Sequence, residues 1–270
     1  MIPRPAKLLT SNSELRADGI SNWTLPAFAV KLLDGRNFNV CPEAGACAQV
    51  CYARNGTYLF PAVRRKHLLN LHFVLDDLEG WKTAMITELG AKRFRPTGVP
   101  KEIERVPLDS VDEWVRQWLL SGGKAVRVHD SGDFFSDEYT DAWLEVARAV
   151  PDVLFYAYTK EVSRFRRMVD GVAPDNFRWL YSMGGRQDSL VDKDTDRHAD
   201  VFLSLVSMTE DGYVDQSDND LQAVLLPNVR IGIPANNIPH FKKRMSGKTF
   251  AGLQSDRDSH RAERLADSSL

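Results

Sequence analysis

The sequence predicts an α/β protein whose parallel strands form a TIM-like (β/α) barrel, full or partial. Strand-like and helix-like segments alternate from residue 125 onward, each repeat spans about 25 to 30 residues, and 270 residues suffice for one barrel. Parallel strands need a crossover connection, so this alternation implies helices packed outside a parallel sheet. We expect one barrel-like domain over residues 1–240 and a partly mobile C-terminal tail over residues 241–270.

The segment before these repeats is predicted to contain a β-hairpin. Residues 27–33 form an apolar run, Asp34 and Gly35 give a turn signal, and residues 37–40 alternate again. Three cysteines follow, and amphipathic helical patterns then cover residues 61–75 and 81–89. The cysteine segment is therefore expected to be a loop between a strand and a helix.

The repeats begin after a proline-rich, charged stretch, and the clearest helix among them covers residues 137–150. Tyr139, Trp143 and Val146 fall on one face of that helix, and Ser136 is placed to cap it. The other predicted elements are helices over 110–120 and 163–169 and strands over 125–129, 153–158, 177–182, 201–207 and 229–233.

Charge and hydropathy exclude a global attraction to nucleic acid or to an anionic membrane. The 35 Lys and Arg residues are balanced by 37 Asp and Glu residues. The N-terminus lacks the apolar run of a signal peptide, and nowhere do 18 consecutive apolar residues occur. We therefore expect no membrane partner and a reducing cytoplasm, where disulfides are disfavoured.

The three cysteines, Cys41, Cys47 and Cys51, fall inside the stretch CPEAGACAQVCYA, and the loop is taken as residues 41–52. Thiolates gathered this closely repel one another unless a cation or metal cluster compensates them. Three thiolates leave one iron of a 4Fe-4S cluster without a protein ligand, so that iron can bind a substrate or cofactor. Loss of the exposed iron would give a 3Fe-4S form. Tyr52 is placed to shield the end of the loop.

Two alternatives for the cysteines stay open. Structural zinc also binds thiolates but needs four ligands, so His67 or His72 would have to supply the fourth. The thiols can also be unmetallated or redox-active.

Polar residues follow the predicted strands, where functional groups gather in parallel α/β folds. We predict Asp133, Lys160 and His129 as catalytic candidates. The cofactor-binding candidates are Ser131, Gly132, Asp133, Tyr52, Ser182 and Arg186. The alternative is that these residues are helix caps, turns, solvated charges and a hydrogen-bonded histidine.

A basic group lies shortly after the cysteines and comprises Arg54, Arg64, Arg65, Lys66 and His67. Such a group can bind the phosphates of a nucleotide or nucleic acid. The alternative is a solvated helix face.

The chain resembles radical S-adenosylmethionine enzymes in its three-cysteine loop before a helix and in Ser131-Gly132-Asp133 after the following strand. That tripeptide is similar to the superfamily's Gly-Gly-Glu motif, which binds the methionine amino group. More narrowly, CPEAGACAQVCYARNG, HDSGDFFSDEY and FYAYTK resemble the gene product 88 family of actinobacterial phages, over roughly residues 8 to 235.

The resemblance implies a barrel with a cubane cluster on Cys41, Cys47 and Cys51 and S-adenosylmethionine on the open iron. It also implies an electron donor and a bacterial host cytoplasm. The cysteines are spaced by five and three residues where the superfamily usually has three and two.

The leading hypothesis is thus a radical S-adenosylmethionine type enzyme acting on a nucleotide, nucleic acid or small metabolite. One alternative is an iron–sulfur enzyme whose open iron acts without S-adenosylmethionine, as a Lewis acid or redox site. Another is a non-catalytic iron–sulfur or zinc protein that binds nucleic acid through the helix bearing Arg64 and Arg65.

Overall fold

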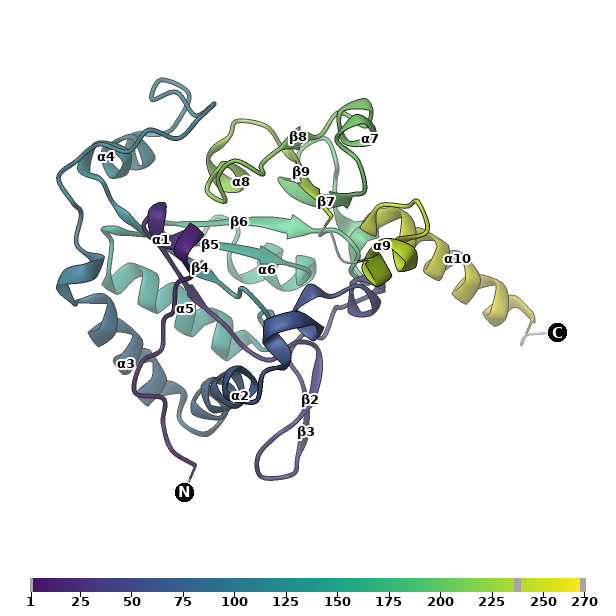
Figure 1. Ribbon diagram of the computed structural model, residues 1–270, viewed down its shortest axis with the longest axis horizontal. Helices are drawn as coiled ribbons and strands as arrows, with labels where there is room; N and C mark the ends of the chain where they lie inside the picture. The colour runs from purple at the N-terminus through teal and green to yellow at the C-terminus, as the bar shows by residue number, and fades with distance from the viewer. Residues whose placement is uncertain (1, 236–238, 268–270) are drawn as a thin grey trace.

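A computed structural model describes residues 2–235 and 239–267, and its centre is a seven-stranded sheet (Figure 1). The strands are β1 (Ile20–Trp23), β4 (Lys124–Val128), β5 (Val153–Thr159), β6 (Phe177–Ser182), β7 (His198–Phe202), β8 (Val214–Asp215) and β9 (Arg230–Pro234). Their order is β1-β4-β5-β6-β7-β9-β8, and every neighbouring pair is parallel. The predicted α/β class with a parallel sheet is confirmed.

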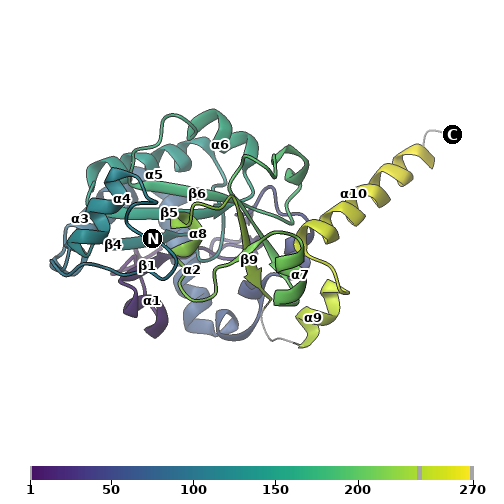
Figure 2. The ribbon, with the colours of Figure 1, turned by 90° about the horizontal axis from the view of Figure 1, so that it is seen from above.

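Helices connect the strands and cover the sheet (Figures 1 and 2). The α-helices are α1 (Ser13–Ala17), α2 (Pro61–Asp76), α3 (Leu78–Leu89), α4 (Glu113–Ser121), α5 (Asp137–Ala149), α6 (Val162–Met168), α7 (Leu205–Glu210), α8 (Gln222–Leu225), α9 (Pro239–Met245) and α10 (Phe250–Asp267). Short 3₁₀ turns are η1 (Ala46–Gln49), η2 (Tyr52–Arg54), η3 (Gly56–Leu59), η4 (Lys92–Phe94) and η5 (Asp188–Leu190). As predicted, the Ser136 side chain caps α5, accepting a hydrogen bond from the Tyr139 amide.

Two hydrophobic cores lie on opposite faces of the sheet because side chains alternate along each strand. On β5, Phe155 and Ala157 belong to the core that also holds Trp81 of α3 and Trp143 of α5. Leu154 and Tyr156 face the other way, into a core formed with α4 and α8. Arg127 of β4 and Tyr158 of β5 line a cavity at the carboxyl ends of the strands.

Closure of the sheet into a full barrel is not seen in the part of the chain that the structure describes. β1 and β8 are the two edges of the sheet, and no pairing joins them. β1 and β8 have only four and two residues, so each offers few backbone groups for pairing.

The N-terminal hairpin is confirmed, whereas several strand boundaries differ from expectation. β2 (Ala29–Lys31) and β3 (Asn37–Asn39) pair antiparallel just before the cysteines. The strand predicted over 201–207 lies at His198–Phe202 instead, because Ser204 accepts a hydrogen bond from the Ser207 amide and so begins α7. β1 and β8 had not been predicted, since both are short and flanked by polar residues.

The segment expected to be a tail contains two helices as far as residue 267. Gln254 of α10 is buried, whereas residues 257–267 are exposed and α10 extends away from the body (Figures 1 and 2). Residues 268–270 of the expected tail lie outside the described residues. In the described ranges, we find no helix with the length and apolar character needed to cross a bilayer.

Candidate metal centre

The three cysteines line one cavity of about 800 Å³ at the carboxyl ends of the strands. Cys41 follows β3, Cys47 lies in η1 and Cys51 directly precedes η2, and all three are half-buried and free of disulfides. Six of the seven strands contribute to the same cavity, through Asn22, Arg127, Tyr158, Ser182, Val201, Ile233 and Pro234. The structure therefore joins the cysteine loop to the predicted functional edge of the sheet.

Burial raises the pKa of all three thiols, most strongly that of Cys41. The neighbouring charge of Lys160 opposes this rise at Cys47. The charges of Cys47 and Cys51 also raise the pKa of Cys41, and that of Cys47 raises the pKa of Cys51. Burial and mutual repulsion both disfavour the thiolate forms. A positively charged metal group would offset both effects, so the three half-buried thiols are suited to binding one.

The cysteine loop is held against the end of β6 by backbone hydrogen bonds. The Cys47 amide donates to the Gly184 carbonyl at 3.0 Å, and the Arg186 amide donates to the Glu43 carbonyl at 2.8 Å. A Cβ atom at Gly45 would lie 2.8 Å from the Gly184 carbonyl oxygen. Gly45 is therefore required for this close approach.

The helices of the expected tail also hold the loop. In α10, Gln254 Oε1 accepts a hydrogen bond from the Ala46 amide at 2.7 Å, and Arg257 donates to the Gly45 carbonyl at 3.0 Å. Arg244 of α9 donates to the Gln49 carbonyl at 2.8 Å. These partners come from about 200 residues further along the chain, and no sequence pattern signalled them.

Asp133 ties two strand ends together. Its carboxylate accepts hydrogen bonds from the Phe134 amide (2.9 Å), the Thr159 hydroxyl (2.7 Å) and the Lys160 amide (2.9 Å). Burial raises the pKa of Asp133, and these hydrogen bonds oppose the rise. The side chain lines the cavity, but its position is set by bonds within the protein.

Ser131, Gly132, Lys160 and Ser182 also line the cavity, as predicted for a common site. The buried Ser131 Oγ has no hydrogen-bond partner within the protein. Lys160 Nζ donates to Ser182 at its carbonyl (2.9 Å) and its hydroxyl (2.6 Å). Of these four residues, Ser131 is therefore the one whose side chain is left free to bind a ligand.

His129 also lines the cavity, but its side chain is buried in contacts within the protein, and Arg186 lies outside the cavity. The His129 ring packs edge-on against Phe134, and its Nε2 lies 2.9 Å from the Tyr139 hydroxyl. Burial lowers the pKa of His129 to about 3. The residue follows β4 directly and has a φ of +66°, in the left-handed region. Arg186 is exposed and does not line the cavity.

Tyr52 belongs to a polar cluster on the cavity wall that was largely missed from the sequence. Its hydroxyl donates to the Asp130 carbonyl, and Tyr58 donates to the Asp130 carboxylate. Arg127 lies between Asp130 (3.8 Å) and Asp220 (3.4 Å). The sequence did carry one signal for this cluster. Arg127 is a charged residue within the largely apolar strand Lys124–Val128, and because side chains alternate along a strand, a single face of the sheet carries it.

The two histidines considered as a fourth zinc ligand lie in different parts of the structure. His67 lines the cavity, and burial lowers its pKa to about 4. His72 is buried elsewhere, where its Nε2 accepts a hydrogen bond from the Leu33 amide at 3.0 Å. Within residues 2–235 and 239–267, no three His, Cys, Asp or Glu side chains form a group arranged to hold a metal ion.

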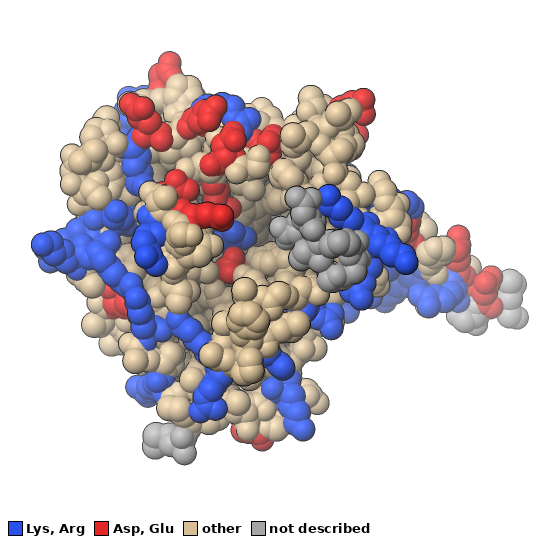
Figure 3. All heavy atoms as spheres, in the orientation of Figure 1, with Lys and Arg blue, Asp and Glu red and all other residues tan. Residues whose placement is uncertain are grey.

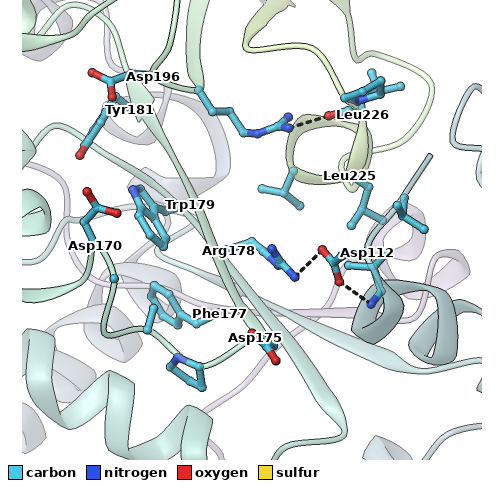
Figure 4. Close-up of a pocket in the computed structure, with 18 of the residues that line it drawn as sticks. Asp112, Asp170, Asp175, Phe177, Arg178, Trp179, Tyr181, Asp196, Leu225 and Leu226 are labelled. Carbon is cyan, nitrogen blue, oxygen red and sulfur yellow. Dashed lines mark hydrogen bonds and ion pairs between the residues drawn. The ribbon is translucent and has the colours of Figure 1, made fainter. Parts of the chain in front are cut away.

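A second cavity, of about 480 Å³, lies at the amino end of β6 (Figure 4). Arg178 Nη2 pairs with Asp112 at 2.7 Å, and Arg197 donates to the carbonyls of Ala223 and Leu226. None of the candidate site residues lines it. It is separate from the cysteine site.

Fold and site together define a parallel α/β protein with a cysteine-lined cavity at the carboxyl ends of its strands. The sequence pattern of a family described as Gene product 88 matches residues 4–265, and the chain belongs to this family. The Gene 88 protein of Mycobacterium phage L5 is 34% identical over 136 residues, and that of Mycobacterium phage D29 is 32% identical over 136 residues. Each match covers 50% of this chain and 48% of the relative, so the chain spans about half the length of the curated relatives it matches. No solved structure matches it.

Proposed function

We propose that this chain is an iron–sulfur protein that holds a cluster on Cys41, Cys47 and Cys51 with one iron open to the cavity. The observation that carries this proposal is that all three cysteines line one large cavity. In a cubane each thiolate binds a different iron, so the thiols need not converge on a single ion. The missing fourth thiolate would leave the open iron facing the polar strand ends.

The reaction we favour is of the radical S-adenosylmethionine type, with an electron donor as partner. A cluster with an open iron supplies one-electron reduction of S-adenosylmethionine bound to it. Ser131 is the residue that would bind the cofactor's polar groups, because its hydroxyl is buried, lines the cavity and has no partner in the protein. Lys160 contributes positive charge beside Cys47, and Asp133 fixes the ends of β4 and β5 around the cofactor.

The finer fold proposal is a partial barrel. Residues from six strands line the same cavity, which a flat sheet could not enclose. This supports a sheet that curves around the site. The relatives are phage proteins, which supports placing the protein in the cytoplasm of a bacterial host cell.

The test is anaerobic reconstitution of the full chain with iron and sulfide, followed by iron and sulfide counts and electron paramagnetic resonance. We expect a cluster whose spectrum changes when S-adenosylmethionine is added. Stoichiometric zinc without sulfide would end the cluster proposal. An intact cluster that ignores S-adenosylmethionine would end the radical assignment and leave an open iron that acts as a Lewis acid or redox site.

Two sets of variants sharpen this test. Cys41→Ser, Cys47→Ser and Cys51→Ser should each lose most of the iron. Ser131→Ala is the matched control for the cavity: it should keep the cluster and weaken the spectral response to S-adenosylmethionine. Equal iron retention in all four variants would contradict ligation by the cysteines.

A further inference from the structure

The interior of the cavity is poorly suited to a phosphate group. Four carboxylates line it, from Glu14, Asp130, Asp133 and Asp220, against the positive charges of Arg127 and Lys160. The three thiols would add negative charge on ionisation. Such an interior favours a ligand part that is neutral and rich in hydrogen-bonding groups. Gln216 Oε1 supports this, because it is buried on the cavity wall without a hydrogen-bond partner.

The rim beside α2 has the opposite character. Leu59 and Phe60 are 54% and 59% exposed, and their sequence neighbours Tyr58 and Val63 line the cavity. Phe60 is the N-cap residue of α2, and its carbonyl accepts a hydrogen bond from the Arg64 amide at 2.9 Å, so both residues lie at the first turn of the helix. In the described chain, the exposed Arg64 and Arg65 form no ion pair.

The rim beside α9 is basic as well. Phe241 lines the cavity, and the next three residues, Lys242, Lys243 and Arg244, are exposed. Figure 3 shows basic side chains over α9, on one side of the central hollow, and acidic side chains on the opposite side, over α8 and β8. An anionic chain would therefore lie along the α2 and α9 side of the mouth and away from the α8 side.

We propose that the substrate is single-stranded nucleic acid, which places one base in the cavity and its backbone along this basic rim. The inference rests on the proposed function, because it names the substrate class of the same site. A base is neutral and carries the donors that Gln216 Oε1 lacks, while the phosphates stay outside with Arg64, Arg65 and Lys243. Phe60 offers an exposed ring on which a neighbouring base can stack. A paired base cannot reach such a cavity without leaving its duplex.

The test measures binding of the full chain to fluorescein-labelled 12-nucleotide DNA and RNA strands, and to the matching duplex, by anisotropy across a salt series. We expect both single strands, or one of the two, to bind more tightly than the duplex. Arg64→Ala combined with Arg65→Ala should make the slope of log affinity against log salt less steep by about 1.4, as for two lost phosphate contacts. Phe60→Ala should weaken binding by about tenfold, and Phe60→Leu nearly as much, since both remove the ring.

The matched control is Lys92→Ala combined with Arg95→Ala, which removes two exposed positive charges from the η4 region. It should leave both affinity and salt slope unchanged. Equal effects of the two double variants, equal binding of duplex and single strand, or binding only to phosphatidylglycerol vesicles would each overturn the inference.

Rim binding can be measured with and without the cluster, so the two proposals fail separately. Cluster assembly without strand binding would reject the inference alone. Strand binding by a chain that never assembles a cluster would reject the proposed function alone.

Discussion

Replacing Gln254 by alanine should release the cysteine loop from α10. Gln254 is 2% exposed and its Oε1 accepts the Ala46 amide at 2.7 Å, and Ala46 is itself buried. The substitution leaves that amide without a partner, which costs about 1–3 kcal/mol. Because the contact joins α10 to η1 and no strand pairing depends on it, we expect the cost to fall on local opening of the loop.

Hydrogen exchange followed by mass spectrometry on peptides covering residues 41–52 measures this opening. A cost of about 1–3 kcal/mol corresponds to roughly 5- to 150-fold faster exchange of the loop amides, at 1.4 kcal/mol per tenfold change. Reconstituted Gln254→Ala protein should also lose iron faster than the parent chain. Gln117→Ala is the matched control, since that exposed side chain bonds only Glu113 within α4. Unchanged exchange at Ala46 and Cys47 in Gln254→Ala would refute the reasoning.

Three further outcomes concern stability. The unfolded chain protonates His129 near its ordinary pKa of 6.5 whereas the folded chain does so only near 3, so stability should fall by about 1.4 kcal/mol per unit as pH drops through this window. His129→Gln should remove that slope in urea titrations at pH 7.5 and 5, and an identical slope would contradict the assignment. Gly132→Ala should cost more than about 2 kcal/mol in thermal melts, because φ is +94° and the new Cβ would lie 2.7 Å from the Leu25 side chain. Gly98→Ala, with φ +76° and open space around the new Cβ, should cost about 1–2 kcal/mol from the backbone conformation alone. Asn176→Ala should cost about 1–3 kcal/mol, since its buried amide donates to the carbonyls of Ala147 and Val153; an unchanged melting temperature would argue against those bonds.

The fold class could be predicted from the sequence because its signals are local. The apolar face of α5, its Ser136 cap and the Asp34-Gly35 turn each depend on residues within a few positions of one another. The placing of Ser131, Asp133, Lys160 and Ser182 around one cavity follows from parallel topology alone, which puts all strand ends on one edge.

What could not be predicted depends on side-chain direction and on distant contacts. His129 and Asp130 are adjacent in sequence and both line the cavity, yet the buried His129 ring packs against Phe134 whereas the Asp130 carboxylate accepts a hydrogen bond from Tyr58. The left-handed backbone at His129 gives no signal in the sequence. The role of α10 depends on Gln254 reaching Ala46, a contact between residues 208 positions apart. Gln254 lies in a polar, charged segment with no apolar stripe that would signal packing.

The hydrogen bonds from α10 to the cysteine loop have a consequence for the protein while it is being synthesised. Cys41, Cys47 and Cys51 leave the ribosome long before Gln254 and Arg257 have been made. Until then the loop lacks the two side chains that hold the Gly45 and Ala46 backbone, so the nascent thiols stay accessible to solvent and to metal donors. Docking of α10 then covers the loop, so if the proposed cluster binds here, translation is the period in which it would be most easily inserted.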